Sequence, residues 1–170
     1  MGSLHRRPVF VLSALVVPLL TLAAPGFLRL GGVPPSWAVI WLLPWSLVDG
    51  PLSGALAGLA LGLMLDALHL GSATQMPALA LLGWWWGRLP RRRPPIERSF
   101  SLGLLAMLGS AVLGLSVLLQ RQWSSGWEAL VTAASLHTLL AQVLVTALLA
   151  PMICSLLLLL WRRHSATARG

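Results

Sequence analysis

The chain has 170 residues, of which 57% are hydrophobic and 9% are charged, and its mean hydropathy is +0.83. This composition excludes a soluble globular domain, which does not need so much apolar surface. The apolar runs are continuous rather than alternating, and this excludes a β-barrel. The sequence therefore predicts an all-α, polytopic integral membrane protein, with one membrane domain over residues 1–170.

The net charge of +8 comes with twelve basic residues, all of them arginine. Most lie in three clusters, at residues 5–7, 88–98 and 162–163, each beside an apolar run. This pattern is typical of the loops that set membrane topology, so no nucleic-acid partner is expected. The loop at 88–98 is predicted to be cytoplasmic, and binding of anionic lipid head groups is an alternative role for it.

The first two apolar runs differ in length. The run at 8–28 is long enough to span, although its basic start and Leu22-Ala23-Ala24 also fit a signal peptide. The run at 37–48 reaches only about 18 Å, against a hydrocarbon core of about 30 Å. Its Trp37, Trp41 and Trp45 share one face, which predicts packing and interface anchoring. The six helices predicted in chain order are 8–28, 37–48, 52–70, 77–87, 99–119 and 133–161, the last with Pro151 as a possible kink.

The arginine clusters favour six spans over five. If the second and third runs are separate helices, all three clusters fall on one side, and both termini are cytoplasmic. If these two runs fuse into one span, the N-terminal cluster moves to the other side. In the six-helix arrangement Asp66, His69 and the loop at 120–128 lie at the outer face.

Glycines recur every fourth residue within 50–71, and Asp66 continues the same step. Positions four apart share a helix face, so this face is nearly bare backbone that a neighbouring helix can approach closely. We expect the other helices to gather around this one. The helix-packing or partner-interface residues predicted here are Gly54, Gly58, Gly62, Asp66 and the turn residue Gly71.

Two later segments carry similar signals. Ala106, Ser110 and Gly114 repeat the small-residue spacing, which predicts close contact between helices 99–119 and 52–70. In the last helix, four polar residues at helical spacing are expected to face the bundle. This polar stripe comprises Ser135, Thr138, Gln142 and Thr146.

Few residues could carry chemistry. Asp66 and His69 could form a proton relay or, with Glu128 and His137, a metal site; partner binding is a further alternative. The simplest reading is that Asp66 hydrogen-bonds a neighbouring helix or loop end. No nucleophile–base pair or phosphate loop is evident, and Cys154 fits a small packing residue. No catalytic residue, cofactor or metal is therefore expected.

The central stretch begins with Pro35-Ser36-Trp37, continues as the glycine-spaced helix that ends in Gly62-Leu63-Met64-Leu65-Asp66, and then has Gly71. In these features it resembles the rod shape-determining MreD family. The C-terminal TALLAPMICSLLLLLWRR is also similar, with proline inside the last helix and arginines after it.

This resemblance implies a non-enzymatic subunit of the cell-elongation complex in the bacterial plasma membrane. Family members associate with the bitopic protein MreC and the cytoskeletal protein MreB, and through them with the polymerase RodA and its transpeptidase. The family is also similar in fold to the substrate-binding subunits of energy-coupling-factor transporters, which gives the alternative function. Ala14 followed by Pro18 does not fit the docking face of those subunits, and only the polar stripe offers convergent polar groups.

Overall fold

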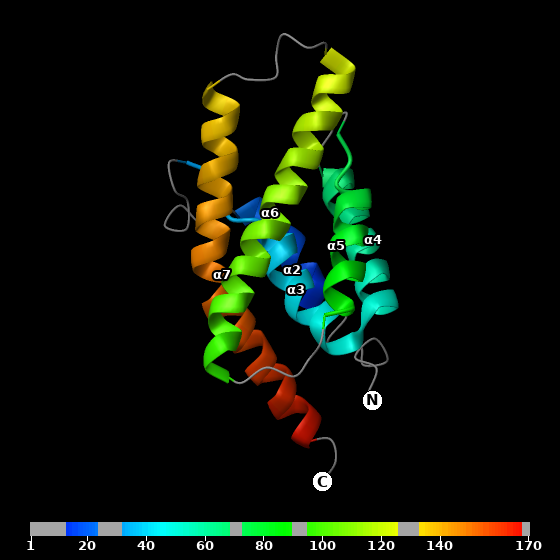
Figure 1. Cartoon of the computed structure of the whole chain (residues 1–170). Helices are drawn as coiled ribbons and strands as arrows, with labels where there is room; N and C mark the ends of the chain where they lie inside the picture. Colours follow the sequence, from blue (N-terminus) through cyan, green and yellow to red (C-terminus); the bar gives the residue numbers. More distant parts are fainter. Residues whose placement is uncertain (1–12, 24–31, 69–72, 90–94, 126–132, 168–170) are drawn as a thin grey trace.

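The computed structural model describes residues 13–23, 32–68, 73–89, 95–125 and 133–167. Within these ranges every regular element is a helix, which confirms the all-α class (Figure 1). The elements are η2 (Ser13–Leu15), α2 (Val16–Ala23), α3 (Trp37–Asp49), α4 (Pro51–Leu68), α5 (Met76–Gly87), α6 (Pro95–Ser125) and α7 (Ala133–Thr167).

Within the described ranges, three helices are long and apolar enough to cross a membrane. They are α4, the part of α6 from Phe100 to Arg121, and the part of α7 from Ser135 to Leu160. The segments Ser13–Ala23 and Trp37–Asp49 are apolar but shorter. The chain is therefore a helical membrane protein in which long and short helices are combined.

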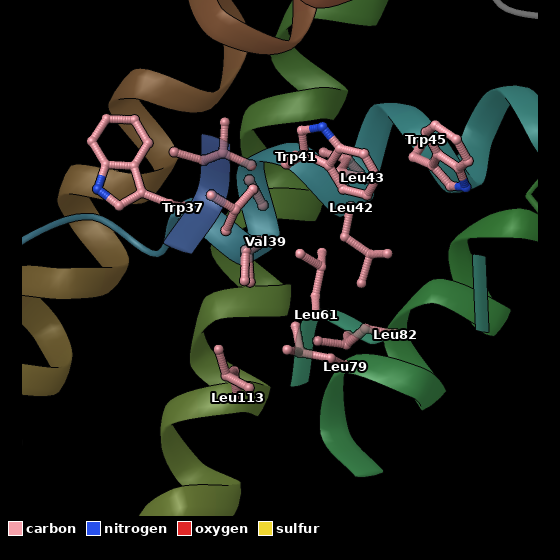
Figure 2. Packing of buried hydrophobic residues seen from close by; sticks show 14 of the residues in the cluster. Trp37, Val39, Trp41, Leu42, Leu43, Trp45, Leu61, Leu79, Leu82 and Leu113 are labelled. Carbon is pink, nitrogen blue, oxygen red and sulfur yellow. The ribbon is translucent and has the colours of Figure 1, made fainter. Parts of the chain in front are cut away.

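The central element is α3, and this corrects the expectation that the helix at 52–70 would be the centre. Residues Trp37 to Ser46 are all buried, and α3 contacts α2, α4, α5, α6 and α7. A helix that is apolar on every face is stable only when it is surrounded. Figure 2 shows α3 side chains packed against Leu61 of α4, Leu79 of α5 and Leu113 of α6.

The N-terminal end of α3 lies near the middle of α7, because Ser36 N–H donates a 2.9 Å hydrogen bond to Thr146 Oγ1. One turn further along α3, the carbonyl oxygen of Ile40 lies 3.3 Å from Cys154 Sγ of α7. Residues 34–36 are thus irregular backbone at membrane depth, which is tolerated where protein covers it. Pro35 and Ser36 are both buried. Helix α3, with 13 residues, is too short to cross a bilayer by itself.

Helices α3 and α4 are separate and fold back on each other at Gly50. This residue has φ 108°, a conformation that side-chain-bearing residues rarely adopt. Pro51 then occupies the first position of α4, where its missing N–H costs no helical hydrogen bond. The two runs therefore do not fuse into one span.

The glycine face of α4 packs against α5. A Cβ on Gly58 would lie 2.6 Å from the carbonyl carbon of Leu79, and one on Gly62 would lie 2.8 Å from the backbone nitrogen of Met76. Likewise, a Cβ on Gly87 of α5 would lie 2.6 Å from the carbonyl carbon of Gly50, the residue before α4. The two backbones are thus in direct contact, as small-residue faces allow.

The small residues of α6 meet different partners from the one predicted. Gly109 abuts the indole of Trp86 on α5, and Gly114 faces Leu139 of α7. Ala106 and Ser110 are buried, and α6 packs mainly against α7. The predicted contact between the α4 and α6 small-residue faces is wrong, because α5 already covers the α4 glycines.

The outward faces of the three long helices are apolar. Leucine, valine and methionine side chains recur there at three- and four-residue steps, as on a lipid-facing surface. These exposed side chains include Leu52, Leu56 and Leu63 on α4, Leu104, Leu108, Val112 and Leu115 on α6, and Leu144, Leu148, Met152 and Leu156 on α7.

Candidate functional site

Asp66 holds the start of α5. Its two carboxylate oxygens accept hydrogen bonds from the backbone N–H of Gln75, at 2.9 and 3.1 Å. Gln75 is the N-cap residue of α5, whose own side chain makes no capping bond. A carboxylate at this place satisfies a free N–H group and stabilises the positive end of the helix dipole. The prediction that Asp66 hydrogen-bonds a neighbouring helix end is therefore confirmed.

A second side chain fixes the adjacent residue. The Gln120 amide, on α6, accepts from the backbone N–H of Thr74 at 2.7 Å and donates to the Thr74 carbonyl at 2.9 Å. It also donates to Ser116 Oγ at 3.1 Å. Asp66 and Gln120 thus tie the residues just before α5 to α4 and α6. This role of Gln120 was not predicted, because no local sequence pattern indicates a pairing over 46 residues.

The other candidates for metal chemistry are not gathered at Asp66. His137 lies exposed on α7, while His69, Gly71 and Glu128 lie outside the described residues. Among the residues that the structure describes, no three histidine, cysteine, aspartate or glutamate side chains are placed to share a metal ion.

The polar stripe of α7 faces the bundle over only part of its length. Thr146 is fully buried, Ser135 and Gln142 are half-buried, and Thr138 is exposed. The expectation that all four residues face the bundle is therefore wrong for Thr138. Helix α3 begins at the level of Thr146 and runs towards Cys154, so nearer the start of α7, where Thr138 lies, there is no α3 surface for the stripe to face.

Thr146 links α3 to α7 through one hydroxyl. It accepts from Ser36 N–H and donates to the carbonyl of Gln142 at 2.6 Å. Valine at this position keeps the shape but leaves the buried Ser36 N–H without that acceptor. We expect Thr146→Val to destabilise the fold by about 1–3 kcal/mol. Thermal unfolding in detergent measures the loss, with Thr138→Val on the exposed part of the same stripe as the matched control. Equal stability of the two variants would contradict this role of Thr146.

A polar chain at the turn between α3 and α4 was not predicted. Trp45 Nε1 donates to Ser53 Oγ at 3.1 Å, and Ser53 Oγ donates to the Asp49 carboxylate. On the same face of α3, Trp41 Nε1 donates to Ser13 Oγ at 3.0 Å. The indoles of Trp41 and Trp45 stack with their centroids 4.9 Å apart. These tryptophans are buried packing residues, so the prediction of packing is confirmed, whereas they do not lie exposed as interface anchors.

An apolar groove of about 490 Å³ opens beside these hydrogen-bonded side chains, between η2, α3 and α4. Trp41 and Trp45 form its inner wall, and α4 supplies most of the rest. The α4 residues that line it are Leu52, Ser53, Leu56, Ala57, Ala60, Leu61 and Met64, and Ala14 and Leu15 complete it.

The end of the α4–α5 hairpin opposite Asp66 carries an arginine and tryptophans. Arg88 Cζ lies 3.6 Å from the ring centroid of Trp84, within the range of a cation–π contact. Trp84 and Trp85 are partly exposed. Because Gly87 packs against Gly50, Arg88 and Asp49 lie at the same end of the hairpin. This end has the arginine and aromatic residues typical of a membrane–water boundary.

No family model, no curated protein and no solved structure matches this chain.

Proposed function

We propose that the chain is a non-enzymatic membrane scaffold subunit of the bacterial cell-elongation complex, of the MreD type. In this proposal it links the actin-like cytoskeleton to peptidoglycan synthesis through an MreC-like bitopic protein, MreB, and a RodA-type polymerase with its transpeptidase. It lies in the plasma membrane as six helices with both termini in the cytoplasm. The membrane location rests on the three long apolar helices.

One observation carries the proposal. The stretch that resembles the family, from Pro35 to Leu81, forms α3, α4 and the first half of α5, and α3 is the central helix of the bundle. Its glycines serve backbone contact and its carboxylate caps a helix, so both motifs act in packing. A scaffold needs such a rigid unit with free outer faces, and the leucine faces of α4, α6 and α7 supply them.

The proposed topology follows from the two ends of the α4–α5 hairpin. Asp49 and Arg88 lie at one end, while Asp66, Thr74 and Gln120 lie at the other. The positive-inside rule assigns the Arg88 end to the cytoplasm. The arginine loop at 88–98 then faces the cytoplasm, where anionic lipids and cytoskeletal partners are found.

The glycines of α4 are no longer candidates for direct partner contact, because α5 covers them. Partner helices would meet the outward leucines instead. The test places a photoreactive amino acid, one position at a time, at Leu56 on α4, Leu108 on α6 and Leu148 on α7, in native membranes. Buried Leu79 is the matched control.

We expect at least one of the three exposed positions to crosslink to an MreC-like protein or the wall polymerase, identified by mass spectrometry, and Leu79 to give no such product. A gentle pull-down of the tagged chain should recover the same proteins. Recovery of paired ATPases with a large coupling membrane protein would instead establish a transporter subunit and overturn the scaffold proposal.

A further inference from the structure

We propose that the groove between η2, α3 and α4 binds one acyl chain of a membrane phospholipid. This inference requires only that the chain lies in a bilayer, so it is independent of the scaffold proposal. The groove has a volume of about 490 Å³ and is lined almost entirely by leucine, alanine, methionine and tryptophan. Its size falls within the range of small-molecule sites.

The inner wall favours hydrocarbon over a polar ligand. Trp41 and Trp45 are amphipathic, but their N–H groups already donate to Ser13 and Ser53. The stacked rings therefore offer the groove their apolar surfaces. Ser53 is the only side chain with a hydroxyl among the lining residues, and it is engaged with Asp49. A polar ligand would lose its hydration here and find few new hydrogen bonds.

The length of the groove fits one acyl chain. The groove follows α4 from Leu52 to Met64, a distance of about 18 Å at the helical rise. One leaflet of the hydrocarbon core is about 15 Å deep, which matches this length. The groove therefore suits an extended acyl chain that lies along α4.

The groove opens towards the bilayer and begins at a polar end. Its rim includes Leu15, Leu52 and Leu56, which are exposed on the outer face of the bundle. Asp49 and Ser53 lie where α3 turns into α4, at the same end of the hairpin as Arg88. A phospholipid with its chain in the groove would place its polar region at this end, where tryptophan and arginine mark the membrane boundary.

The test uses the purified full chain in vesicles of phosphatidylethanolamine and phosphatidylglycerol that contain a small fraction of phosphatidylcholine with a diazirine on one acyl chain. After illumination, labelled positions are mapped by mass spectrometry. We expect several-fold more label on Leu56, Ala60 and Met64 than on Leu148 and Met152 of α7. The last two are each 73% exposed, so exposure alone predicts the opposite order.

Two variants make the test specific. Ala60→Trp fills the groove, and we expect it to reduce labelling of the groove residues several-fold. Ala67→Trp lies on the same face two turns further along α4, outside the groove, and is expected to leave labelling unchanged. Both alanines are exposed, so both variants should fold, and the thermal unfolding of each is measured as a check.

Labelling in proportion to exposure, with α7 ahead of α4, would overturn the proposal, and so would groove labelling that Ala60→Trp does not change. Weak labelling of the groove in the unmodified chain would also overturn it.

Discussion

Replacing Gly58 with leucine is expected to force α4 and α5 apart. A Cβ at this position would meet the carbonyl carbon of Leu79 at 2.6 Å, and a backbone group cannot rotate away as a side chain can. Overpacking typically costs about 1–3 kcal/mol, and the rigid obstacle places this variant at or above the upper end. Membrane insertion should persist, because the substitution raises the hydropathy of α4.

The measurement is thermal unfolding and monodispersity in detergent, together with the amount of protein in the membrane fraction. Ala67→Leu adds comparable bulk to an exposed position of the same helix and serves as the matched control. We expect normal membrane levels for both variants, and a strongly lowered Tm for Gly58→Leu only. Wild-type Tm in Gly58→Leu would show that the helices separate at little cost, contrary to the observed backbone contact.

Trp86→Ala is expected to cost about 3–5 kcal/mol, the range for removing a large aromatic side chain from a core. Trp86 is fully buried, and its indole fills the space that Gly109 of α6 leaves open. Alanine would leave a cavity where α5 meets α6. The adjacent Trp85 is 42% exposed, so Trp85→Ala removes the same side chain from the same helix without opening the core.

Denaturant or thermal unfolding of the two alanine variants measures the difference. Trp86→Phe adds a second test, because the Trp86 N–H has no hydrogen-bond partner in the structure. Phenylalanine removes this unpaired N–H and only part of the ring volume. We therefore expect Trp86→Phe to lower the stability clearly less than Trp86→Ala does. Equal losses for Trp85→Ala and Trp86→Ala would contradict the assigned packing.

Membrane class and close packing by glycine were predictable from the sequence, because they depend on composition and on spacing along one helix. The identity of the packing partner was less accessible. Small residues at four-residue spacing on α4 can accept any nearby helix, and the α6 face looked equally suitable. Gly83 and Gly87 of α5 share this four-residue step, and a Cβ on Gly87 would meet Gly50 directly. Those two glycines were the signal for the correct partner.

The central place of α3 could not be derived from hydropathy. An apolar helix surrounded by protein and one surrounded by lipid have the same composition, since neither environment offers water. Length was the available clue, because a 13-residue helix cannot span. The hydrogen bonds to Thr146 and Cys154 that fix α3 join residues more than a hundred positions apart, and sequence spacing carries no information on such pairs.

The same long separation has a consequence for synthesis. Ser36 leaves the ribosome 110 residues before its acceptor Thr146, which at a typical elongation rate is a delay of roughly 6–20 s. During this time α3 is too short to be held as an independent span, and the α7 surface that will cover it does not yet exist. The nascent chain must therefore hold α3 in the membrane through its hairpin with α4. The packing around α3 is complete only when α7 enters the membrane. A chain truncated before α7 would carry an uncovered α3, the kind of exposed element that membrane quality-control proteases recognise.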